Sequence, residues 1–204
     1  LEYPPIPVFQ ILKNTAQHYP QRACTIFKGA EISYKEMDQI SDTLAAALVR
    51  LGVKKGDRVG ILMPNIPQFV MAFFAILKAG GLVVTLNPLY TAREVEYQLK
   101  DSGVKVLFVM SKFYTLIKQV QHTTELEKVI VTNIKEALPP FTRLLFSLLL
   151  EAKDGHRVSL QEGDIWLSSM LAEKSEQPNV EISADDFAIL QYSGGTTGMP
   201  KGAI

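Results

Sequence analysis

The chain has 204 residues, of which 47% are hydrophobic, so it can bury the core of one large domain or two small ones. Its 21 basic and 21 acidic residues cancel, and this balance gives no indication of a nucleic-acid partner. The first residues do not have the pattern of a signal peptide, and the apolar runs fall far short of the ~20 residues of a bilayer span. The single cysteine, Cys24, cannot form an internal disulfide. These features favour a cytoplasmic globular protein.

Residues 1–55 are predicted to form a helix, a hairpin and a second helix. The predicted elements are a helix over residues 8–18, strands over 23–28 and 31–34, and a helix from Ser33 to Gly52. Ser33 and Glu36 have the spacing of a capping box at the start of the second helix. Apolar residues then recur at helical spacing: Met37, Ile40, Leu44, Leu48 and Leu51.

Residues 56–192 alternate between buried strands and helices, and we interpret them as one α/β subdomain. The predicted strands cover residues 58–63, 82–86, 104–109 and 128–131. The helices between them cover about residues 65–80, 91–103 and 112–121. Thr91 and Glu94 form a second capping box. Strands joined by helices in this way are typical of a doubly wound, mostly parallel sheet with helices on its faces.

An insertion at about residues 134–172 interrupts this alternation. It contains an amphipathic segment, residues 141–150, for which packing on the chain's own sheet is the favoured interpretation. The alternative is a membrane-surface or assembly module, although the segment lacks the dense Lys/Arg face of interfacial helices. A polar linker over residues 174–183 follows, and then a strand over residues 187–192.

The most informative segment follows this last strand. It combines three glycines, three hydroxyl side chains and one lysine: Ser193, Gly194, Gly195, Thr196, Thr197, Gly198 and Lys201. The glycines allow the main chain to approach a phosphate closely, while the hydroxyls and the ammonium can donate to phosphate oxygens. A Walker loop is excluded, because Lys201 follows proline and precedes glycine, where a hydroxyl residue would be needed. The segment therefore predicts a nucleotide-phosphate site at the carboxyl end of a strand, where open α/β sheets place their ligands.

This loop resembles the phosphate loop of the adenylate-forming (AMP-binding) enzymes, a superfamily that includes acyl-CoA synthetases, luciferases and the adenylation domains of peptide synthetases. Their usual pattern is a Ser/Thr/Gly run followed by T-G-x-P-K-G. Further blocks resemble acyl-CoA synthetases in order and spacing: residues 56–59, 63–65, 77–81, 86–88 and 94–101. The form of residues 191–195 is similar to bacterial long-chain fatty-acid–CoA ligases.

The resemblance implies a substrate set of fatty acid, ATP with Mg²⁺, and coenzyme A. It assigns Thr196, Thr197 and Lys201 to the β and γ phosphates of ATP. It further implies that residues 193–204 are the phosphate loop at a truncation point, so that the chain is an inactive amino-terminal part of a longer ligase. No complete catalytic set and no metal ligand is assigned within it. Another adenylate-former, acting on an aryl or amino acid, remains an alternative.

The resemblance also implies how the amino-terminal segment packs and where in the cell the protein is located. Residues 1–55 are expected to pack on a second subdomain outside this chain. The apolar side chains of Leu44, Leu48 and Leu51 would then be exposed here and cause the fragment to self-associate. A peripheral contact at the inner face of the membrane is the alternative to a purely cytoplasmic location.

Overall fold

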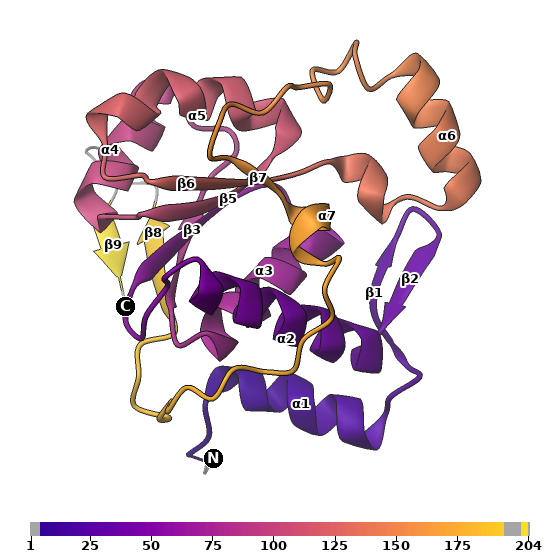
Figure 1. Cartoon of the computed structure of the whole chain (residues 1–204), viewed down its shortest axis with the longest axis vertical. Coiled ribbons are helices and arrows are strands. Elements are labelled where there is room, and N and C mark those ends of the chain that lie inside the picture. The colour runs from indigo at the N-terminus through magenta and orange to yellow at the C-terminus, as the bar shows by residue number, and fades with distance from the viewer. Residues whose placement is uncertain (1–4, 194–200, 204) are drawn as a thin grey trace.

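A central sheet organises the chain, as the computed structural model of residues 5–193 and 201–203 shows (Figure 1). Within these residues the sheet has seven strands in the order β7-β6-β5-β3-β4-β8-β9. Their bounds are β3 Arg58–Leu62, β4 Leu82–Leu86, β5 Val106–Met110, β6 Lys128–Thr132, β7 Ile165–Trp166, β8 Ile189–Ser193 and β9 Lys201–Ala203. Neighbouring strands are parallel except β9, which runs antiparallel to β8. The predicted mostly parallel α/β sheet is confirmed.

Helices cover both faces of this sheet, because its central strands are apolar on both sides. One face packs against α2 (Tyr34–Arg50) and α3 (Pro67–Lys78), with α1 (Val8–His18) beside them. The other face packs against α4 (Ala92–Ser102) and α5 (Tyr114–Val120). In β5 the side chain of Phe108 points to the first face, and those of Leu107 and Val109 point to the second. The sheet therefore has the doubly wound layout that the sequence predicts.

Both predicted capping boxes form. The backbone N–H of Ser33 donates to Glu36 Oε2 at 2.8 Å, and the backbone N–H of Glu36 donates to Ser33 Oγ at 3.3 Å. The bond from the Ser33 N–H, together with a hydrogen bond from Ser33 Oγ to Glu36 Oε2 at 2.7 Å, lowers the pKa of the Glu36 carboxyl below its usual value. Thr91 and Glu94 make the same pair of contacts at the start of α4, which ends at Gly103 in a left-handed conformation with φ of 62°. The local signals thus fix where α2 and α4 begin and where α4 ends.

The expectation that Leu44, Leu48 and Leu51 are exposed is wrong. The side chains of Leu44 and Leu48 are 0% exposed, and Leu51 packs against the same cluster. The cover comes from α3 and the sheet, because α2 lies directly against α3. These three leucines therefore do not provide the surface for self-association that the sequence suggested.

The expectation that residues 141–150 pack on the sheet is also wrong. They form α6 (Pro140–Leu149), which has no buried residue and lies away from the sheet, at the opposite side of the molecule from β8 and β9 (Figure 1). A short 3-10 helix, η3 (Ile134–Ala137), connects β6 to α6, and the hairpin of β1 (Ala23–Phe27) and β2 (Ala30–Ser33) lies beside it. Strand β7 returns the chain to the sheet beside β6, and a four-residue helix, α7 (Leu167–Met170), follows it. No helix within the described residues is long and apolar enough to cross a membrane.

Candidate phosphate-binding site

The two ends of the predicted phosphate loop lie side by side at one edge of the sheet. Strand β8 ends at Ser193, strand β9 begins at Lys201, and these two residues are register partners in an antiparallel pair. Gly194, Gly195, Thr196, Thr197 and Gly198 lie outside the described residues. Of the predicted site residues, the structure therefore brings together Ser193 and Lys201, and it places them at the carboxyl end of a parallel strand.

The glycine that follows Lys201 has a packing reason. A Cβ atom on Gly202 would lie 3.0 Å from Leu190 Cδ1 and 3.2 Å from the ring of Tyr192. Such contacts are tighter than ordinary van der Waals distances, so a larger residue would require the side chains of Leu190 and Tyr192 to shift. Gly202 therefore allows β9 to lie flat on β8 and keeps Lys201 opposite Ser193.

A hydrogen bond to α4 holds β8 at the point where it enters the loop. The hydroxyl of Tyr192 donates to Asp101 Oδ2 at 2.6 Å, and Tyr192 is buried. Burial, together with the neighbouring Asp101 carboxylate, raises the pKa of the Tyr192 phenol well above its usual value, so the hydroxyl stays a donor. Sequence reasoning did not assign this pair. The only signal was that both residues lie in blocks that resemble acyl-CoA synthetases.

Strand β4 supports β8 from its other side. Thr85 pairs with Gln191 in the parallel register, and Thr85 Oγ1 donates to Gln191 Oε1 at 2.8 Å. The Gln98 side chain of α4 donates to the backbone oxygen of Thr85 at 2.8 Å. The last residues of β8 are therefore fixed both by main-chain pairing and by side chains of α4 and β4.

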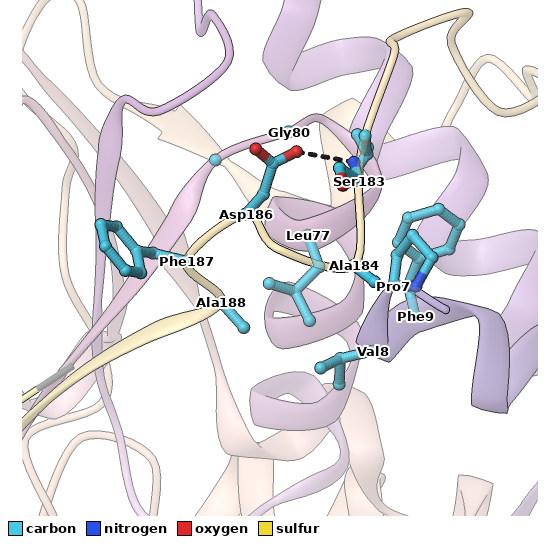
Figure 2. A pocket seen from close by; sticks show the side chains of 12 residues that line it. Pro7, Val8, Phe9, Leu77, Gly80, Ser183, Ala184, Asp186, Phe187 and Ala188 are labelled. Atoms are coloured by element: carbon cyan, nitrogen blue, oxygen red, sulfur yellow. Dashed lines mark hydrogen bonds between the residues drawn. The ribbon is translucent and has the colours of Figure 1, made fainter. Parts of the chain in front are cut away.

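A small pocket lies at the opposite end of β8, where the chain enters the strand (Figure 2). In the segment before β8, the backbone N–H of Ser183 donates to Asp186 Oδ2 at 2.7 Å, which forms a turn. Together with Leu77 of α3 and Val8 of α1, this segment lines the pocket. Lys55 forms an exposed ion pair with Asp186 at 2.7 Å. Because this pocket lies at the amino end of β8, it is separate from the predicted phosphate site, which follows the carboxyl end of the strand.

Comparison with protein families matches residues 12–204 to the AMP-binding enzyme family. This chain belongs to that family.

In the described part of the chain, no group of three or more His, Cys, Asp or Glu side chains is placed to hold a metal ion.

Several similar proteins are long-chain-fatty-acid–CoA ligases. The chain is 34% identical over 198 residues to the enzyme of this name from Bacillus subtilis, covering 95% of this chain and 35% of that protein. It is 32% identical over 202 residues to a 4-coumarate–CoA ligase of Humulus lupulus, covering 98% of this chain and 33% of the relative. The chain thus spans about a third of the length of the curated relatives it matches.

Solved structures of related enzymes share the fold. A long-chain-fatty-acid–CoA ligase from Archaeoglobus fulgidus superposes with a TM-score of 0.74 at 25% identity, covering 99% of this chain and 37% of that one. An anthranilate–CoA ligase in complex with anthranoyl-AMP superposes with a TM-score of 0.77 at 25% identity, covering 98% of this chain and 35% of that one. The fold of this chain is therefore that of the corresponding third of adenylate-forming ligases.

Proposed function

We propose that the complete protein carrying this chain activates a long-chain fatty acid, first to an acyl-adenylate and then to acyl-CoA. The observation that carries the proposal is the pairing of Ser193 with Lys201, the two residues that flank the Gly/Thr-rich sequence after β8. The similarity to long-chain-fatty-acid–CoA ligases supports this choice of acid and reaction. Cytoplasmic location and Mg²⁺ as the companion of ATP belong to the same proposal.

In the first half-reaction a carboxylate oxygen of the acid attacks the α-phosphorus of ATP. The bond between the α-phosphorus and the bridging oxygen breaks, and pyrophosphate leaves. Hydroxyls of Thr196 and Thr197 would donate to the departing phosphates, and the Lys201 ammonium would neutralise charge that grows on them. In the second half-reaction the thiol of coenzyme A attacks the acyl carbon, releasing AMP and a proton. The contribution of this chain is to position and stabilise charge.

The test is acid-dependent ATP–pyrophosphate exchange by the complete protein with palmitate, octanoate and 4-coumarate. Replacing Lys201 with alanine should slow exchange about a hundredfold, the scale of losing one transition-state charge donor. Lys35→Ala, which removes an exposed lysine at the start of α2, is the matched control and should leave the rate unchanged. An unchanged rate for Lys201→Ala would contradict the role of this lysine.

The choice of acid rests on a different measurement. Exchange with 4-coumarate but not with palmitate would mean that the substrate is an aryl acid and not a fatty acid. The similarity to the Humulus lupulus 4-coumarate–CoA ligase is the reason to test this alternative. The 204 residues alone should show no exchange, because they span only about a third of the relatives' length. Exchange by this chain above a protein-free blank would refute that part of the proposal.

A further inference from the structure

Helix α6 presents its apolar face to solvent. Five apolar side chains follow the i, i+3, i+4, i+7, i+8 spacing that places them on one face of a helix. Their exposed fractions are 73% for Phe141, 57% for Leu144, 41% for Leu145, 72% for Leu148 and 67% for Leu149. Contiguous exposed apolar side chains of this kind mark a surface that contacts another protein, a membrane or a ligand.

Contacts on the opposite side hold α6 in this orientation. The ring of Phe146 points inward and meets the ring of His156 edge-on, with the ring centroids 5.5 Å apart. Arg157 Nη2 donates to the backbone oxygen of Ser147 at 3.3 Å. The helix is therefore attached through its polar side and its single inward-facing aromatic residue.

A buried polar cluster fixes the segment that follows α6. Lys135 Nζ pairs with Glu151 Oε1 at 2.6 Å, and Asn133 Nδ2 donates to the same oxygen at 2.8 Å. His156 Nδ1 lies 2.9 Å from Ser111 Oγ, and both residues are buried. Because Ser111 follows β5 and Asn133 follows β6, the cluster attaches the α6 segment to the rigid edge of the sheet.

Exposed lysines lie near both ends of α6. Lys153 follows the helix and is exposed. Arg143 and Arg157 belong to the attached side, since Arg143 is three residues before Phe146 and Arg157 binds the backbone of Ser147. Lys28 is exposed at the tip of the β1–β2 hairpin. This tip lies close to the start of α6, since a Cβ atom on the next residue, Gly29, would be 4.0 Å from Pro139 Cγ. Between residues 138 and 158 Asp154 is the exposed acidic residue, since Glu151 is buried in its ion pair. An apolar stripe with a lysine near each end is complementary to an anionic lipid surface.

The size of the face also favours lipid over protein. A helix of 10 residues is about 15 Å long, half of the ~30 Å hydrocarbon core, so α6 can lie in the interface but not span it. A stable protein–protein interface buries roughly 800 Å² on each partner, which one short convex helix face does not supply. Insertion into a lipid surface needs only that the apolar side chains reach about 5–10 Å below the headgroups.

We propose that α6, with Lys28 and Lys153 near its ends, docks the protein on an anionic membrane surface, with Phe141, Leu144, Leu145, Leu148 and Leu149 inserted into the lipid. Docking there would bring the enzyme to the phase in which long-chain fatty acids dissolve. That last consequence rests on the proposed function, whereas the docking itself rests on α6 alone.

The test is co-sedimentation of the complete protein with vesicles of phosphatidylcholine, with and without phosphatidylglycerol. Leu148→Asp should lower the partition coefficient about tenfold or more, and Leu144→Asp with Leu148→Asp should abolish sedimentation. Ile11→Asp, at an apolar residue of α1 that is 60% exposed, is the matched control and should sediment like the wild type. Lys153→Gln should lower binding about fivefold on anionic vesicles and leave binding to phosphatidylcholine alone unchanged.

Three results would overturn the docking proposal. The first is a wild-type protein that does not sediment with anionic vesicles, and the second is a Leu148→Asp variant that sediments as well as the wild type. The third is a dimer in light scattering that Leu148→Asp converts to a monomer, which would assign the face to a second copy. Exchange with palmitate at a submicellar concentration in lipid-free buffer separates the two proposals. Docking without exchange would reject the proposed function alone, and exchange without docking would reject the role of α6 alone.

Discussion

The side chain of Lys78 is 0% exposed and neutralises two carboxylates between α2 and α3. Its ammonium donates to Asp38 Oδ1 at 2.6 Å, to Asp42 Oδ1 at 2.6 Å and to the backbone oxygen of Asp38 at 3.0 Å, so all three of its protons are used. The carboxylate side chains are 18% and 20% exposed. Replacing Lys78 with methionine keeps most of the volume but leaves two largely buried carboxylates facing each other.

Removing one partner of a buried ion pair typically costs ~3–5 kcal/mol of unfolding free energy. We expect about 3 kcal/mol at pH 7 for Lys78→Met, the lower end of that range, because water still reaches part of each carboxylate. Adding Asp38→Asn and Asp42→Asn removes the unpaired charges and should restore stability to within about 1 kcal/mol of the wild type. Urea unfolding followed by circular dichroism and Trp166 fluorescence measures each difference.

The same variant should show a characteristic pH dependence. Burial raises the pKa of the Asp42 carboxyl, and the Lys78 ammonium opposes that rise. Without the ammonium the pKa rises further, and an acid with a raised folded-state pKa favours the folded state when it is protonated. Its stabilising effect is complete below the ordinary carboxyl pKa and disappears as the pH rises through the folded-state value. The deficit of Lys78→Met should therefore shrink between pH 7 and pH 5. A deficit below about 1 kcal/mol at pH 7, or one that the two asparagine substitutions do not reduce, would refute the reasoning.

Two further substitutions test the packing and capping of the fold. Gly60→Ala should destabilise the chain by about 1–3 kcal/mol in urea unfolding, because the added Cβ on β3 would lie 2.6 Å from Leu107 Cδ1 and 3.1 Å from Val104 Cγ1; a neutral result would mean that β5 moves aside freely. Ser33→Ala should cost about 1 kcal/mol by removing the side-chain cap of α2, and Ser33→Thr should retain most of it. Since capping lowers the pKa of Glu36, the stabilising effect of its carboxylate is present above the ordinary glutamate pKa and is lost as the pH falls through the lowered value. A Ser33→Ala deficit that does not change down to pH 3 would contradict this link.

The sequence predicted the central sheet because each of its main strands is a short apolar run between helix signals. The capping boxes at Ser33 and Thr91 and the stop at Gly103 are local contacts, so spacing alone was enough to place them. Strands β7 and β9 were not predicted, since two or three residues show no periodicity. The pairing of Ser193 with Lys201 depends on β8 as a template, which no local pattern reveals.

The amino-terminal helices show a second limit of sequence reasoning. The apolar spacing of Leu44 and Leu48 required a cover for α2 but did not say which part of the protein supplies it. The resemblance pointed to a subdomain outside the chain, whereas α3 and the sheet supply the cover. The ion pairs of Lys78 with Asp38 and Asp42 also join α3 to α2, and contacts between segments so far apart in the chain could not be seen in the sequence.

Helix α6 carries the same kind of apolar stripe as α2, and yet the structure turns its stripe outward. Periodicity indicates that a helix has an apolar face, but the surrounding chain determines what that face meets. Here the neighbours of α6 are polar: His156, Glu151 and Asn133 form hydrogen bonds among themselves and to the ends of β5 and β6, and they leave room for only one inward aromatic residue, Phe146. Arg143 and Phe146 lie on the same side of α6, opposite the leucines, so turning the helix over would break the Phe146–His156 contact and place the leucines against the polar cluster. An apolar stripe beside a satisfied polar cluster is therefore better interpreted as a surface for a second phase than as part of the core.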